Sequence, residues 1–281
     1  MSNHEVNEKI REAIVAGIFY ADEPEALQKA IDKVLAAAKP LRDGAIAILT
    51  PHAGFAYTGA IQALAWKAAC GRAVKRVVMI APHHHSQGSK IYLPESRFFQ
   101  SPLGDIPVDI EICDEIESCG TLFEINDIPH LEEHALEVQL PFMKRLFPDA
   151  TLIPMIADGN EVSAILAVAR ALDLVLGSER ETTLIVVSSN LSSSAANFDS
   201  ARQADQLLDM ICQGDWHGVI GNREQRTSTA CGCNAIAQLM ACTMTDGTEV
   251  SILGRSDSRL QDGDNADRIV HYAAAAWYPG G

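Results

Sequence analysis

Two short apolar segments of this sequence each run directly into proline and histidine. Residues 45–49 precede a Pro-His pair that ends at His52, and residues 76–81 precede the run Pro-His-His-His at 82–85. Short apolar runs bounded by turn residues are typical of buried strands. A helical pattern at residues 60–70 separates them, which predicts a parallel β-α-β unit with a right-handed crossover. Both histidine groups should then lie at the carboxyl edge of the sheet, where open α/β sheets bind ligands.

The alternation of strand-like and helix-like segments continues along the chain. Further strands are predicted at residues 151–156, 183–187, 249–253 and 270–277, and further helices at residues 162–176, 198–212 and 216–220. The sequence contains no internal repeat and no low-complexity linker. We therefore predict a single α/β domain over residues 1–281, with a central, mainly parallel or mixed sheet flanked by helices.

The intervening segments carry weaker patterns. We interpret residues 5–37 as helical at both ends, and Thr58 as the cap of the helix at 60–70. Short strands are expected at residues 91–94 and 109–112, one helix is expected from Glu132 onwards, and another from Cys231 to Met244. Four prolines interrupt residues 86–129, which indicates an excursion beside the sheet.

Composition narrows the classes of function. The chain has 22 Lys and Arg against 37 Asp and Glu, a net charge of −15, which argues against binding of nucleic acid through the phosphate backbone. No run approaches the roughly 20 apolar residues of a membrane span. The N-terminus lacks a basic region followed by an apolar one, so we expect a cytoplasmic protein without a membrane partner. Seven cysteines, an odd number, do not suggest a disulfide framework.

Histidine and cysteine form the main candidate site. Imidazole binds iron, copper, zinc or nickel, so His52 and one or two members of the run at 83–85 could share a metal ion. Successive side chains point apart, so the three histidines at 83–85 cannot all bind the same ion. The pair Cys231 and Cys233 lies at a predicted helix start, where a thiol pKa is lowered. Alternatively, both cysteines are buried and inert. They do not form a structural zinc motif, because such a site needs a second pair of ligands.

Two further groups of polar residues flank this site. His130, His134 and Glu137 should share one helical face, although the zinc motif HExxH is absent. They would either orient ligands and move protons or form a solvated face. Residues 188–194 are rich in serine and follow a predicted strand, but they lack a GxSxG elbow, which favours a polar pocket over a serine hydrolase. The absence of a glycine-rich phosphate loop argues against nucleotide cofactors.

Five motifs occur in the order found in a known family. They are Pro-His-Ala-Gly-Phe-Ala-Tyr-Thr-Gly at 51–59, Ala-Pro-His-His-His at 81–85, Glu-His-Ala-Leu-Glu-Val-Gln-Leu-Pro at 133–141, Val-Ser-Ser-Asn at 187–190 and Cys-Gly at 231–232. In this the chain resembles the Memo family, whose bacterial and archaeal members are called AmmeMemoRadiSam system protein B. That family is similar in fold to class III extradiol dioxygenases, which are non-haem iron enzymes that cleave aromatic rings.

The resemblance implies a metal site and its ligands. His52, His84 and Cys231 would bind the metal, because the first member of the family's histidine pair falls on His84. Fe(II) is the metal that the resemblance favours, and the softer thiolate also suits copper or zinc. The family often has aspartate and histidine at the positions of Asn190 and Ser193. His134 or His85 would then be the acid–base group, since Ser193 cannot accept a proton near neutral pH.

Three functions remain open at this point. The first is metal-dependent redox chemistry, similar to that of a dioxygenase, on an unknown small molecule. The second is a non-catalytic module that binds a peptide or a small ligand in the same pocket. The third is a metal-dependent hydrolase with His134 as the base. The resemblance also implies a radical-SAM protein as a partner, because bacterial members tend to be encoded beside one.

Overall fold

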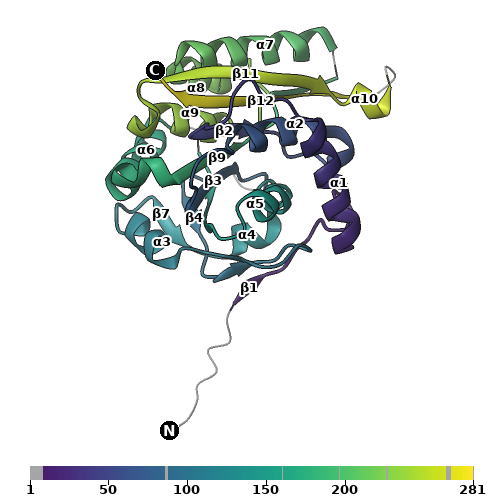
Figure 1. Ribbon diagram of the computed structural model, residues 1–281. Helices are drawn as coiled ribbons and strands as arrows, with labels where there is room; N and C mark the ends of the chain where they lie inside the picture. The colour runs from purple at the N-terminus through teal and green to yellow at the C-terminus, as the bar shows by residue number, and fades with distance from the viewer. Residues whose placement is uncertain are drawn as a thin grey trace.

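A mixed sheet with helices on both faces forms the centre of the molecule (Figure 1). The computed structural model describes residues 9–85, 88–159, 161–195, 197–225, 227–263 and 267–280. Within these residues the strands of the main sheet are, in spatial order, β10 (Ser192–Ser194), β12 (Ile269–Pro279), β2 (Ala47–Thr50), β9 (Thr183–Ser188), β3 (Arg76–Pro82), β8 (Thr151–Ala157), β4 (Ile91–Leu93) and β7 (Phe123–Ile125), and β11 (Thr248–Asp257) pairs with β12. The predicted α/β class with a mixed sheet is confirmed.

Helices cover the two faces of this sheet. Figure 1 shows α1 (Pro24–Ala37), α2 (Phe55–Ala68) and α5 (Leu140–Leu146) on one side, and α3 (Ile110–Glu117), α6 (Val162–Leu176) and α9 (Cys233–Ala241) on the other. The remaining helices are α4 (Ile128–Glu132), α7 (Asn197–Gln213), α8 (Trp216–Glu224), α10 (Arg259–Asp262) and the 3-10 turns η1 (Glu137–Gln139), η2 (Gly177–Thr182) and η3 (Thr243–Thr245). Buried apolar side chains from both faces join in one continuous core. No helix in the described part of the chain is both long and apolar enough to cross a membrane.

The four central strands explain where polar side chains gather. β2, β9, β3 and β8 run parallel, and their residues are almost entirely buried because helices cover both faces. The two strands of the predicted β-α-β unit, β2 and β3, are parallel but not adjacent, because β9 lies between them and pairs with both. Since all three strands are parallel, the residues at their carboxyl ends still meet at one edge of the sheet.

The N-terminal region departs from the helical prediction for residues 5–37. Residues 5–8 lie outside the described residues, and Ile10–Arg11 form β1, which pairs with β5 (Phe98–Phe99) in a small sheet completed by β6 (Ile106–Pro107). Only the second predicted helix, α1, is present in the described part of this region. The helix after His52 begins at Phe55, so the prediction that Thr58 caps it is wrong. The Thr58 hydroxyl lies within the helix and donates to the carbonyl of Ala53, at 2.8 Å.

In two other segments the structure differs from the predicted secondary structure. Residues 109–112 alternate between acidic and apolar residues, which favours a strand, but Asp109 caps helix α3 by accepting the N–H of Ile112. The expected helix from Glu132 is interrupted: α4 ends at Glu132, and Glu133 has an extended backbone. The Glu133 carboxylate accepts the N–H of Ala135 at 2.9 Å and thus competes with helical hydrogen bonding. His130, His134 and Glu137 therefore do not share one helical face.

Candidate metal centre

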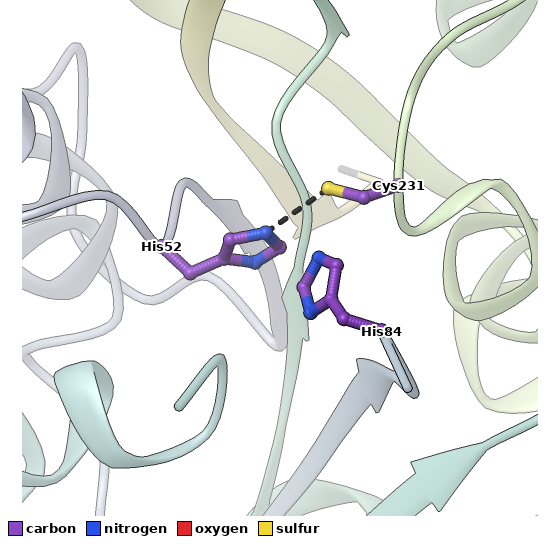
Figure 2. Close-up of side chains that lie close together, drawn as sticks. All are labelled: His52, His84 and Cys231. Carbon is purple, nitrogen blue, oxygen red and sulfur yellow. Dashed lines mark hydrogen bonds between the residues drawn. The ribbon is translucent and has the colours of Figure 1, made fainter. Parts of the chain in front are cut away.

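Three segments that are distant in sequence bring His52, His84 and Cys231 together (Figure 2). His52 follows β2, His84 follows β3, and Cys231 precedes α9. One ligand atom from each side chain lies within 4.8 Å of the other two. The His52 Nε2 atom is 3.0 Å from the Cys231 Sγ atom, and the two imidazole rings are nearly perpendicular, with centroids 5.2 Å apart. The structure thus brings the three predicted ligands into metal-binding proximity.

A buried serine fixes the orientation of the His52 ring. The His52 Nδ1 atom is 2.9 Å from the Ser188 hydroxyl, and this hydroxyl donates its single hydrogen to the carbonyl of Ala135 at 2.8 Å. Ser188 must therefore accept a hydrogen bond from His52 Nδ1–H. In the neutral ring this leaves the lone pair on Nε2, which faces Cys231.

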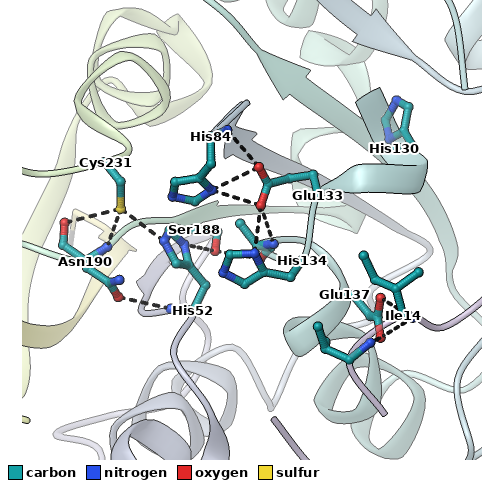
Figure 3. Close-up of polar contacts among 12 residues, drawn as sticks. Ile14, His52, His84, His130, Glu133, His134, Glu137, Ser188, Asn190 and Cys231 are labelled. Carbon is teal, nitrogen blue, oxygen red and sulfur yellow. Dashed lines mark hydrogen bonds and ion pairs between the residues drawn. The ribbon is translucent and has the colours of Figure 1, made fainter. Parts of the chain in front are cut away.

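A buried carboxylate does the same for His84. Glu133 accepts hydrogen bonds from the His84 ring Nδ1 and from the His84 backbone N–H, both at 2.9 Å (Figure 3). Burial alone would lower the pKa of His84, but hydrogen bonds with Cys231 and Glu133 and their charges raise it to about 10. Burial likewise opposes ionisation of Glu133, yet the bonds from His84 hold its pKa at about 2. A metal ion at this position would replace the His84 proton.

The two members of the Cys-Gly-Cys sequence differ in chemistry. Burial would raise the pKa of Cys231, but the charges and hydrogen bonds of His52 and His84 lower it well below its usual value. The N–H of Asn190 also donates to the Cys231 sulfur, at 3.2 Å. Cys231 lies just before the N-cap Gly232 of α9, which begins at Cys233, and the two imidazoles account for the lowered pKa. Burial raises the pKa of Cys233 to about 11, so this second thiol stays neutral.

His134 lies beside the three candidate ligands. Its ring stacks on that of His84 with centroids 5.2 Å apart, and lies perpendicular to that of His52 at 5.7 Å. Burial, followed by the charge of His52, lowers the pKa of His134 to about 4, so the ring is neutral at pH 7. His84, Glu133 and His134 also form a group of ligand spacing. We assign Glu133 an orienting role, because its carboxylate already accepts hydrogen bonds from His84 and from the N–H of Ala135.

The other candidates lie apart from this cluster. His85 is exposed and lines neither of the two cavities that approach the cluster. His130 is buried and points away from the cluster, and its Nε2–H donates to the carbonyl of Tyr92 (Figure 3). Burial lowers the pKa of His130 to about 3. Glu137 is fully buried and forms an ion pair with Arg11. His130 and Glu137 therefore support the fold rather than the cluster.

Asn190 and Ser193 occupy the positions at which the family that the sequence resembles often has aspartate and histidine. The Asn190 side chain accepts the N–H of His52 at 3.3 Å, so Asn190 connects the segments that carry His52 and Cys231. Ser193 lies in β10, where its N–H donates to Thr229 at 2.8 Å. Ser193 is absent from the lining of both cavities. Sequence reasoning assigned no role to Glu133 and placed Ser188 only in a general polar pocket, although both lie within the five family motifs.

Two cavities approach the cluster from different sides. The first, the apolar cavity, has a volume of about 410 Å³ and a mainly apolar lining. Its walls include the aromatic rings of Phe19, Tyr57 and Tyr272. Its polar lining residues are His52, His134, Asn190, Ser258, Asp262 and Arg268. The second, the polar cavity, has a volume of about 350 Å³ and reaches Cys231 beside a buried pair of His83 and Asp158, 3.0 Å apart. An apolar cavity with a few convergent polar groups is typical of a small-molecule site.

Comparisons with known proteins identify the family. A “MEMO1 family protein” of Aeropyrum pernix is 29% identical over 278 residues, covering 95% of this chain and 99% of that protein. A “MEMO1 family protein” of Nitrosopumilus maritimus is 26% identical over 273 residues, covering 94% and 98%. The crystal structure of an uncharacterised protein of Escherichia coli K12 shares the fold, with a TM-score of 0.52 and 10% identity over 82% of this chain and 98% of that one. The family model described as “Memo-like protein” matches residues 11–276, and the chain therefore belongs to the Memo family.

Proposed function

We propose that this protein is a metal-dependent oxidoreductase that binds one divalent transition-metal ion, in the first instance Fe(II), through His52, His84 and Cys231. The observation that carries the proposal is the convergence of two imidazoles and the Cys231 thiol within 4.8 Å, beside the apolar cavity. The resemblance to non-haem iron dioxygenases supports iron over other metals.

The donor set fits such an ion. Two imidazoles and a thiolate suit iron, copper or zinc. Histidines that bind metals almost always donate their second ring N–H to an oriented acceptor, and Ser188 and Glu133 supply these acceptors here. Three protein ligands leave further coordination positions open, as in catalytic rather than structural sites. When bound, the ion would supply a Lewis acid and a one-electron redox centre.

The residues of the chain would bind the substrate and move its proton. The apolar cavity suits a small, mainly apolar molecule because aromatic side chains form much of its wall. His134 faces this cavity and is neutral at pH 7, so it can accept a proton from a bound hydroxyl group. Ser193 does not line this cavity and cannot accept a proton near neutral pH, so His134 is the proposed acid–base group of this chain.

Elemental analysis of protein purified without added metal or chelator tests the metal site. We expect about one equivalent of iron in the wild type, and a loss of it in His52→Ala, His84→Ala and Cys231→Ser. His85→Ala is the matched control, because His85 is the exposed neighbour of His84 and should leave the metal content unchanged. Copper in place of iron keeps the redox proposal. Zinc would favour a hydrolase with His134 as base, and a wild type that binds no metal, even with added Fe(II), would refute the proposal.

Oxygen consumption with a panel of small aromatic alcohols tests the redox chemistry. Uptake should require the metal and should fall by roughly 10²-fold or more in His134→Ala, which is the usual contribution of a general acid–base group. Unchanged uptake in this variant would remove His134 from the mechanism without affecting the metal assignment.

A further inference from the structure

The segment that precedes α1 forms one wall of the apolar cavity. Ile18 and Phe19 line the cavity together with His134. Ile18 is 75% exposed, whereas Phe19 is half-buried. The Phe19 ring meets the His134 ring edge-on, with centroids 5.1 Å apart and planes inclined by 71°. Phe19 is therefore in contact both with the cavity and with the proposed acid–base group.

Hydrogen bonds hold the Phe19 backbone on both sides. Its N–H donates to the carbonyl of Val15 at 2.8 Å, and its carbonyl accepts the N–H of Phe55 at 2.7 Å. The turn is closed by Gly17, whose φ of +76° is strained for other residues. Because the backbone is fixed at both polar groups, the Phe19 ring cannot leave the cavity wall through a simple movement of the loop.

A buried carboxylate anchors this turn to the body of the protein. Glu137 accepts hydrogen bonds from the N–H groups of Ile14 and Val15 and from the hydroxyl of Tyr20, at 2.7–3.0 Å (Figure 3 shows the contact with Ile14). Arg11 completes the anchor through its ion pair with Glu137. Fully buried, satisfied networks of this kind are rigid, so the turn presents Phe19 in one position.

We propose that Phe19 is a specificity-determining residue of the apolar cavity: its ring limits the size of the aromatic molecule that binds and keeps the His134 ring in place. This rests on the proposed function in taking the apolar cavity as the substrate site. The His134 ring is held between the Phe19 ring, which it meets edge-on, and the His84 ring, on which it stacks. A smaller side chain at position 19 would remove the first of these contacts and would open the wall toward the exposed Ile18.

Binding of two probes of different size to metal-free protein tests this proposal. The dissociation constants of phenol and 2-naphthol are measured by NMR titration for the wild type, Phe19→Ala and Phe19→Leu. Phe98→Ala is the matched control, because Phe98 is a half-buried phenylalanine in β5 that does not line the cavity. Circular dichroism confirms that each variant is folded, and Phe19→Leu replaces Phe19→Ala if the latter is not.

We expect both Phe19 variants to bind phenol about two- to tenfold more weakly, as loss of an aromatic contact implies, and to gain affinity for 2-naphthol relative to phenol. A merely structural role would weaken both probes equally. An unchanged ratio of the two constants, or a wild type that binds neither probe, would overturn the proposal. Because the titrations use metal-free protein, their outcome does not depend on whether the purified protein binds a metal ion.

Discussion

The most demanding prediction concerns the carboxylate of Glu137, which lies outside the metal cluster. The Glu137 and Arg11 side chains are 0% and 1% exposed. Every hydrogen-bond partner of the two Glu137 carboxylate oxygens is a donor. Glu137→Gln changes one of these oxygens to an NH₂ group. The new group then faces donors instead of accepting from them, and the Arg11 guanidinium loses its counter-charge.

The expected cost follows from these contacts. Breaking a buried ion pair by changing one partner costs about 3–5 kcal/mol. Arg11 keeps hydrogen bonds to the carbonyls of Glu12, His130 and Glu133, which favours the lower end of this range. We therefore expect the free energy of unfolding to fall by about 3 kcal/mol. For a chain of 281 residues that corresponds to a decrease of roughly 5 °C in melting temperature.

Thermal and urea unfolding of metal-free protein measure this change. The matched control is Glu249→Gln, because Glu249 forms an ion pair with Arg42 in which the side chains are 67% and 45% exposed. Exposed pairs contribute at most about 1 kcal/mol, so the control should melt close to the wild type. If Glu137→Gln melted within about 2 °C of Glu249→Gln, the reasoning about the anchor would be refuted.

Three further predictions concern other parts of the molecule. Glu133→Gln should weaken metal binding about 10–100-fold by loosening the neighbouring imidazole, as measured by competition with a chelator; equal affinity would remove the orienting role. Burial opposes ionisation of Asp127, but its hydrogen bond with Lys9 keeps its pKa below the ordinary 3.8. The ionised Asp127 carboxylate therefore stabilises the fold above about pH 4, and this stabilisation is lost as the pH falls further. Urea titrations should show that the difference in unfolding free energy between the wild type and Asp127→Asn becomes smaller below pH 4. A Cβ at Gly232 would lie 2.7 Å from a backbone carbonyl, so Gly232→Ala should lose about 1–3 kcal/mol of stability, whereas Gly221→Ala, with open space around it in α8, should be neutral or stabilising.

The approach of His52 to the histidine run at 83–85 could be predicted because strand patterns are local information, whereas the choice of His84 and of Cys231 as ligands came from the resemblance to the family. The apolar runs before His52 and His84 predict strands, and parallel strands place the residues at their carboxyl ends along one edge of the sheet. Which strands are neighbours depends on non-local pairing. Nothing between β2 and β3 indicates that β9, formed by residues about 100 positions later, is inserted between them.

Glu133 shows why the rest of the site could not be predicted. Residues 132–143 have a helical pattern, and only the contacts of the Glu133 carboxylate with His84 and Ala135 explain why the helix breaks there. The contact with His84 needs a segment about 50 residues away in sequence. The same applies to Cys231, whose pKa is lowered by two imidazoles rather than by the helix that begins after it.

The insertion of β9 between two earlier strands has a consequence for synthesis of the chain. When β2 and β3 leave the ribosome, neither has its final partner, because β9 is made about 100 residues later. The outer edge of β2 waits still longer, until β12 pairs with it. Such open edges attract other chains, so this nascent protein should depend on holding chaperones during translation. The group of His52, His84 and Cys231 is likewise incomplete until Cys231 has been made, late in translation.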